Sequence, residues 1–177
     1  MDAILAEDLS EASLLGFRDG IGDETLTALF DYWRGLARGR SLPSRADVDP
    51  VRIPRQALAH AMLIDVEWPE PPRQPPFRLR FRLMGTAVVA SREGITPQDA
   101  TGCYLDEIPF RQGYERVAAF YGNAATKGCP AYHTGVYAPD HPRFAGIFHR
   151  LALPLSADGR RVNMLLTAFR RGPAPAA

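Results

Sequence analysis

Cysteine is scarce in this 177-residue sequence, and its two copies, Cys103 and Cys129, are too few for a disulfide framework. Lysine is scarcer still, because Lys127 is the only one and arginine supplies the remaining positive charge. The formal net charge is +1 and no polybasic run occurs, so nucleic acid is not an expected partner. Two thiols without a framework favour a reducing, cytoplasmic environment.

Long hydrophobic runs and export signals are also missing. No apolar stretch approaches the roughly 20 residues that a membrane-spanning helix needs, and the first residues do not form a basic-then-apolar signal peptide. We therefore expect a cytoplasmic protein that does not insert into a membrane. Neither a phosphate-binding glycine-rich loop nor a nucleophile elbow occurs, so no enzyme activity is expected.

The most regular pattern is an alternation of apolar and basic residues in residues 77–86. The two sets take alternate positions: Phe77, Leu79, Phe81 and Leu83, against Arg78, Arg80 and Arg82. Successive side chains of a strand point to opposite faces, so this period predicts a strand with one face on a core and the other in water. Such a strand is typical of an antiparallel sheet.

An amphipathic helix is predicted over residues 23–38, where Asp23 can cap the N-terminus. Its apolar stripe contains Leu26, Leu29, Phe30 and Trp33. This stripe must be buried, either against the sheet of its own domain or against a second copy of the chain. In the second case these four residues form the interface of a homodimer.

The remaining pattern predicts strands at residues 62–68, 131–138, 144–155 and 161–170, and a longer helix at residues 111–127. Short helices are expected at 87–94 and 101–109. Four regions follow: a flexible or partly helical arm (1–22), the helix and a connector (23–60), the core (61–171) and a disordered tail (172–177). In the connector, Arg45, Asp47 and Asp49 either set turns or bind something.

Three segments, in this order, resemble signatures of the PAS fold. Residues 81–86 are similar to its second strand, residues 101–109 to the TG-x-x-L-x-D segment before its long helix, and residues 151–159 to the turn before its last strand. Upstream, Tyr32-Trp33 and the stretch Leu42 to Pro50 resemble the bacterial single-domain PAS-5 family. The resemblance implies an α+β fold: a five-stranded antiparallel sheet with helices on one face, extended by the N-terminal amphipathic helix.

The resemblance also implies a sensory or interaction module in bacterial signalling, and two functions stay open. The first is a sensor that binds a small ligand in an apolar pocket and relays the signal through protein contacts. The second is a ligand-free module that dimerises and regulates a histidine kinase or a motility pathway. The expected pocket lining, which is filled core in the second function, is Ile64, Phe81, Leu83, Leu105, Val117, Tyr121, His149, Leu151 and Met164.

No cofactor is required by the sequence. Cys103 lacks the neighbouring asparagine and glutamine of light-sensing flavin domains. His133 and His149 would lie close together across a hairpin that turns at residues 139–142, and could then ligate haem iron or another metal. However, no third ligand is specified, and a register slip of one residue would place the two imidazoles on opposite faces. No metal site is therefore expected.

Overall fold

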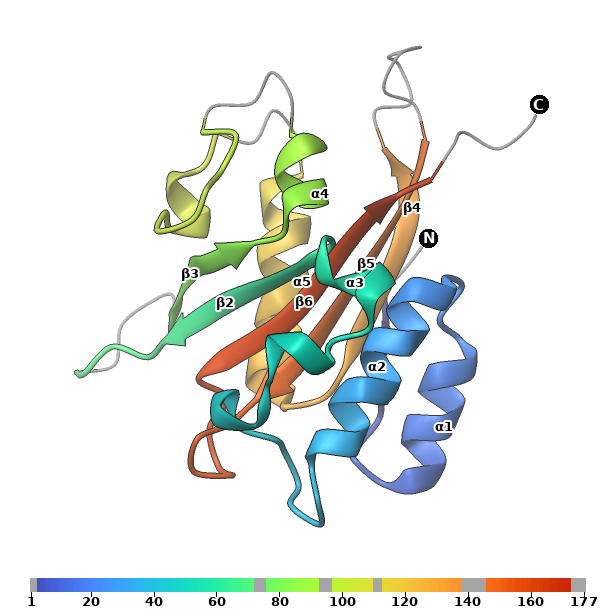
Figure 1. Cartoon of the computed structure of the whole chain (residues 1–177). Coiled ribbons are helices and arrows are strands. Elements are labelled where there is room, and N and C mark those ends of the chain that lie inside the picture. Colours follow the sequence, from blue (N-terminus) through green and yellow to red (C-terminus); the bar gives the residue numbers. More distant parts are fainter. Residues whose placement is uncertain (1–2, 72–75, 93–96, 110–112, 138–145, 173–177) are drawn as a thin grey trace.

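The computed structural model describes residues 3–71, 76–92, 97–109, 113–137 and 146–172 (Figure 1). Six strands form one antiparallel sheet in the order β1-β4-β5-β6-β2-β3. The strands are β1 (Ile4–Leu5), β2 (Ala61–Glu67), β3 (Arg78–Met84), β4 (Ala131–Tyr137), β5 (Gly146–Leu155) and β6 (Met164–Arg171). The helices are α1 (Glu11–Asp19), α2 (Glu24–Leu36), α3 (Arg55–Leu58), α4 (Thr86–Ala90) and α5 (Tyr114–Lys127), with short 3-10 turns η1 (Arg45–Asp47), η2 (Pro50–Arg52) and η3 (Leu105–Glu107).

The five expected strands correspond to β2 through β6, and the N-terminal arm adds the sixth. β1 pairs with the start of β4, where Ile4 lies opposite Tyr132. The same arm contains α1, whose Phe17 ring lies 5.4 Å from that of Phe30 in α2. A two-residue strand has no measurable period, so the sequence pattern could not reveal β1. At the other end, residues 173–177 of the expected tail lie outside the described residues.

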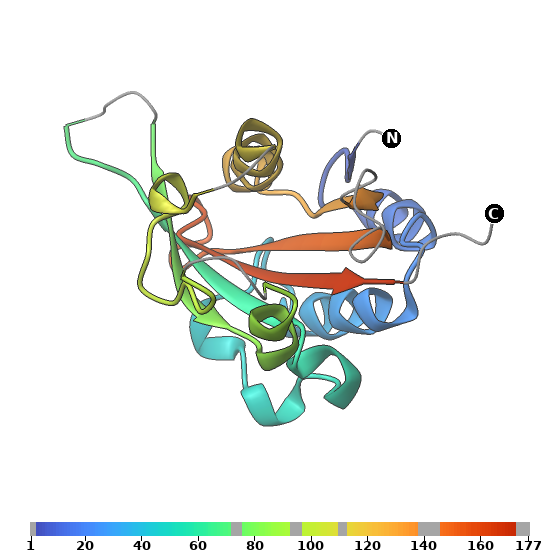
Figure 2. The same ribbon diagram turned by 90° about the horizontal axis from the view of Figure 1, so that it is seen from above.

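Helices cover both faces of the sheet (Figure 2). α5 lies on one face, where the Phe120 ring is 6.0 Å from the His133 ring of β4. α2 lies on the other face, where the indole N–H of Trp33 donates to the carbonyl of Pro154 in β5 over 2.9 Å. The sheet therefore lies between two helical layers, and buried residues lie on both of its faces.

The apolar stripe of α2 is buried within its own chain. Leu26, Leu29 and Phe30 are 0 % exposed and Trp33 is 2 % exposed. The interface interpretation of these four residues is therefore wrong, because they already fill the layer between α2 and the sheet. A second copy of the chain cannot contact them while this layer is intact.

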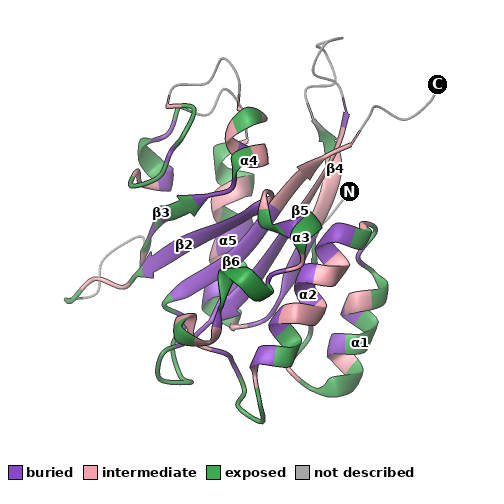
Figure 3. Ribbon diagram, viewed as in Figure 1, coloured by how far each residue is buried: buried purple, intermediate pink, exposed green. Residues whose placement is uncertain are grey.

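The central strands are buried on both faces, whereas β3 alternates (Figure 3). Asp65 is the one charged side chain of β2 that is buried, and it binds Arg82 of β3 at 2.8 Å. The half-exposed pattern expected from the arginine alternation thus describes the edge strand. It does not extend to β2 and β5, because α2 and the connector that follows it cover the face that would otherwise meet water (Figure 2).

A bulge in β3 changes the side to which its last residues point. Leu63 pairs with Leu83 but Ile64 pairs with Phe81, so Arg82 is an extra residue on β3. The alternation shifts by one position there. Met84 is buried while Leu83 is 47 % exposed, which corrects the expectation that Leu83 continues the apolar face.

The connector residues make local turns. Asp47 accepts hydrogen bonds from the backbone N–H of Ser44 and from Arg40, and these bonds lower the pKa of its carboxyl group to about 2. Arg45 donates to the carbonyl of Val48, and Asp49 accepts from the N–H of Val51. Of the two interpretations left open, these contacts favour the structural one.

Candidate functional site

The nine expected pocket residues do not line one cavity. Cross-strand partners point to the same side of a sheet, so the register assigns each strand residue to a face. The α5 face receives Ile64 and Phe81 from the sheet and Val117 and Tyr121 from the helix. The α2 face receives the other four strand residues: Leu83, His149, Leu151 and Met164. Leu105 is buried in η3, beside β3.

The two histidines of the hairpin lie on opposite faces of the sheet. His133 pairs with Arg150, and Thr134 pairs with His149. This register differs from the one expected from a turn at residues 139–142, a segment outside the described residues. In the part of the chain that the structure describes, no three histidine, cysteine or acidic side chains gather to hold a metal ion.

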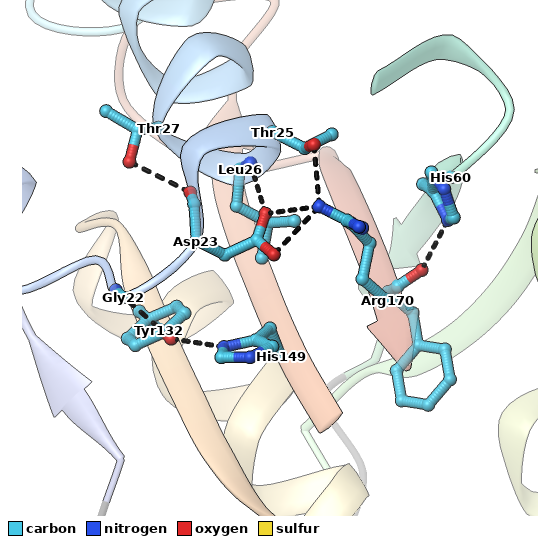
Figure 4. A network of polar contacts seen from close by, with 10 residues as sticks. Gly22, Asp23, Thr25, Leu26, Thr27, His60, Tyr132, His149 and Arg170 are labelled. Carbon is cyan, nitrogen blue, oxygen red and sulfur yellow. Dashed lines mark hydrogen bonds and ion pairs between the residues drawn. The ribbon is translucent and has the colours of Figure 1, made fainter. Parts of the chain in front are cut away.

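On the α2 face, a polar network joins the start of α2 to β6 (Figure 4). The Asp23 side chain caps the helix by accepting from the N–H of Leu26 at 3.0 Å. Arg170 donates to the same carboxylate at 2.9 Å and to the hydroxyl of Thr25 at 2.7 Å. One carboxylate therefore ends the helix and fixes it to the last strand.

Two histidines extend this network. The Tyr132 hydroxyl accepts from the N–H of Gly22 and lies 2.6 Å from Nδ1 of His149. Nδ1 of His60 lies 3.2 Å from the carbonyl of Phe169 (Figure 4). Each contact joins segments that are distant in sequence, so the network holds the N-terminal helix and its connector on the sheet.

The free energy of unfolding is expected to fall on mild acidification. Burial lowers the pKa values of His60 and His149 below 6.5, with Asp23 opposing the shift and Arg170 adding to it. The unfolded chain then binds these protons at higher pH than the folded chain does. Stability is therefore greatest above about pH 6.5 and declines as the pH drops through that value.

Urea denaturation at several pH values between about 8 and 5 measures this effect. The double variant His60→Gln with His149→Gln should show a flatter dependence than the wild type. An equal slope in the two proteins would contradict the assignment.

The α5 face holds a different group of residues, centred on Arg150. Its guanidinium carbon lies 5.3–5.8 Å from the centres of four aromatic rings: Phe120, Tyr121, Phe148 and Phe169. Arg150 is partly buried, between the aromatic side chains of α5 and those of β5 and β6. Aromatic faces attract a cation at such distances. β5 thus places a positively charged side chain among four aromatic rings.

Two buried hydroxyl groups, those of Tyr121 and Thr167, lie on the same face of the sheet as this cation. Tyr121 is 3 % exposed, and burial raises the pKa of its phenol, with Arg150 and Thr167 opposing the shift. Thr167 is 0 % exposed, and its hydroxyl, although close to Tyr121, makes no hydrogen bond of good geometry within the described structure. A buried hydroxyl without such a bond is costly and needs an explanation.

His133 completes the group, because its ring lies 5.0 Å from Phe148 and 6.0 Å from Phe120. We call these residues the α5-face cluster: Phe120, Tyr121, His133, Phe148, Arg150, Thr167 and Phe169. Of them, the expected pocket contained Tyr121 alone. Arg150 could have indicated this group from the sequence, because it is a charged residue directly before the apolar run of Leu151 to Leu155, which is buried.

A surface hollow of about 380 Å³ lies elsewhere, between residues 40–42 and the β5–β6 turn at residues 156–159. Its acid, Asp158, already accepts hydrogen bonds from the backbone N–H groups of Arg161 and Arg160 and from Ser156. These bonds lower the pKa of Asp158 to about 2. The hollow is therefore built around a turn whose acid is already hydrogen-bonded within the turn.

Comparison with known proteins gives one match. A family model described as PAS domain, of the PAS-5 group, matches residues 22–93, which span α2 through α4. Residues 22–93 are thus similar to a PAS domain. The open antiparallel sheet and its helices are consistent with a PAS-like fold, to which β1 adds a strand. No curated protein and no solved structure matches the chain.

PAS domains are generally sensory or interaction modules in signalling, and the match over residues 22–93 suggests a role of this broad kind. The matched segment contains the buried stripe of α2, which is thus part of the PAS sequence pattern rather than an added interface. Within the described residues, no helix has the length and apolar character needed to cross a membrane.

Proposed function

We propose that this PAS protein is a non-catalytic sensor that binds a small molecule between α5 and the sheet. Binding there would be relayed through contacts with a partner protein. The observation that carries the proposal is the α5-face cluster, in which aromatic walls surround a few polar groups. Small-molecule sites are mostly apolar with a small number of placed polar groups.

The position of these groups supports a sensory role over a purely structural one. Thr167 and Tyr121 bury hydroxyls in the same layer, and the Thr167 hydroxyl lacks a well-formed hydrogen bond. A bound molecule could supply the missing partner. In the α2 layer, Asp23 and Tyr132 accept hydrogen bonds from backbone N–H groups, and among the described side chains Nε of Arg170 is the buried atom there that lacks one.

The alternative is a ligand-free module that dimerises. The dimer interface expected for it, on α2, is buried within the chain. Trp33 and Phe30 pack on their own sheet. A dimer would have to use another surface.

Native mass spectrometry of the protein purified from its host tests the proposal. We expect an adduct that is lost on denaturation. Tyr121→Phe should reduce the bound fraction, because it removes a hydroxyl from the site. Tyr132→Phe, which removes a hydroxyl from the other face, is the matched control and should retain the adduct. A bare chain mass for the wild type would contradict the proposal and favour the interaction module.

A further inference from the structure

We infer that two copies of this chain associate through the outer edge of β4, where residues 133–137 of one copy pair antiparallel with the same residues of the other. This inference goes beyond the proposed function, because it concerns the contact between copies of the chain and needs no ligand. It follows from the backbone groups that this edge of the sheet presents and from the side chains beside them.

The outer edge of β4 is covered by β1 along part of its length. β1 pairs with the first two residues of β4, with Leu5 opposite Ala131 and Ile4 opposite Tyr132. Within the described part of the chain, no strand pairs with residues 133–137 on the side away from β5. The edge of a sheet carries a row of backbone N–H and C=O groups to which another strand can be added.

The direction of these backbone groups follows from a hydrogen bond at the start of β4. The carbonyl of Pro130 accepts from the N–H of Ala6 in the N-terminal arm at 3.0 Å, so it points away from β5. The N–H and C=O groups of successive residues alternate in direction along a strand. Because β4 pairs with β5 without a register shift, the backbone groups of Thr134 and Val136 also point outward.

β3, at the opposite end of the strand order, is protected against pairing with another strand (Figure 1). It contains Arg78, Arg80 and Arg82, with a bulge at Arg82, and Tyr104 makes a β-bridge to Arg80 on its outer side. Charged side chains, bulges and covering segments are the means by which proteins block the edge of a sheet. By contrast, residues 133–137 contain no arginine, lysine or acidic residue.

The edge of β4 is complementary to itself. If two copies lie antiparallel about a two-fold axis at Gly135, Thr134 of one copy is opposite Val136 of the other. Both residues point their backbone groups outward, so the two partners exchange both of their N–H to C=O hydrogen bonds. Threonine and valine are β-branched and suit a cross-strand pair. At the axis, glycine brings no side chain into the contact.

The surroundings of the edge also favour a second copy as its partner. Val136 is 56 % exposed, and Ile4 of the adjoining β1 is 39 % exposed, so pairing would remove apolar surface from water. The formal net charge of the chain is +1, so two copies repel each other weakly. A strongly charged partner would gain no ion pair from the uncharged residues 133–137.

Analytical ultracentrifugation of the full chain, from about 1 to 500 µM, tests the inference by mass action. We expect a monomer at the lowest concentration and a rising fraction of dimer above it, because a contact of this length gives a weak association. A single monomeric species at about 500 µM would overturn the inference.

The variant Val136→Lys should raise the dissociation constant of the dimer at least about tenfold, because a charge at an edge opposes strand pairing. Leu58→Lys is the matched control. Leu58 is also an exposed apolar residue, at 45 %, but it lies in α3 before β2, and β5 and β6 separate β2 from β4. It should leave the dimer unchanged. An unchanged dimer in Val136→Lys, or an equal loss in both variants, would overturn the assignment to β4.

Hydrogen–deuterium exchange at about 5 and 500 µM locates the interface. We expect slower exchange at the higher concentration in the peptide that covers residues 133–137, because the outward N–H groups of Thr134 and Val136 become bonded. Slowing confined to α2 or β3 would overturn the inference. Its failure is distinct from that of the proposed sensor, since a monomer that carries an adduct contradicts the dimer alone, and a dimer without an adduct contradicts the sensor alone.

Discussion

Replacing Trp33 with alanine is expected to lower the free energy of unfolding by about 3–5 kcal/mol. The side chain is 2 % exposed, and its ring lies 5.8 Å from that of Phe30 in the layer between α2 and the sheet. Truncation leaves a cavity there and also removes the indole N–H that donates to the carbonyl of Pro154. Urea denaturation followed by circular dichroism measures the loss.

Arg34→Ala is the matched control for Trp33→Ala. Arg34 is the next residue of the same helix and is exposed, so its removal should change stability by no more than about 0.5 kcal/mol. A Trp33→Ala protein that keeps wild-type stability but changes its oligomeric state would show that the α2 stripe is an interface after all.

The variant Gly85→Ala is expected to destabilise the fold by about 3 kcal/mol through overpacking. A Cβ atom at position 85 would lie 2.3 Å from the carbonyl oxygen of Ala59 and 2.7 Å from that of Ala61. These are backbone atoms that cannot rotate away, and both carbonyls already accept hydrogen bonds, from Ala87 and from Gly85 itself. The expected loss of stability comes from this close approach of the Cβ atom to backbone atoms. It does not come from backbone strain, because the φ angle of Gly85, −66°, suits any residue.

Gly35→Ala is expected to change stability in the opposite direction to Gly85→Ala. Gly35 is exposed inside α2, and a Cβ atom there would meet nothing within 4 Å. Alanine favours a helix over glycine by about 0.5–1 kcal/mol, so this variant should be slightly more stable than the wild type. If both glycine variants had the same small effect, the close packing of Gly85 against the start of β2 would be refuted.

Much of the fold could be predicted, because its elements have clear periods. The arginine alternation of β3 and the stripe of α2 each indicate an element and its buried side. The cap of α2 at Asp23 was likewise readable, since an aspartate precedes the apolar stripe by three residues. The PAS resemblance then supplied the order in which the elements are connected.

The candidate site could not be predicted, because strands that are buried on both faces do not alternate between apolar and polar residues. Between Leu151 and Leu155 every residue of β5 is buried, so the sequence does not show which of them face α5. The bulge at Arg82 also reverses the side of Leu83 without any change in the pattern. An expected pocket built from such strands mixes the residues of two layers.

The histidines illustrate the same limit. An assumed turn at residues 139–142 brought His133 and His149 together, while the observed register pairs them with Arg150 and Thr134. One residue of register decides whether a side chain belongs to the α5-face cluster or to the network around Asp23. Sequence alone fixes that register only where one face of a strand is polar.

Hydrogen–deuterium exchange tests most directly whether the sensing site lies on the α5 face. The protein purified from its host is compared with the same protein after unfolding and refolding, which releases any bound molecule. We predict faster exchange in the refolded protein for amides of α5 and of β5, with α2 unchanged. Equal exchange in α5 before and after release, or a change confined to α2, would contradict a ligand site between α5 and the sheet.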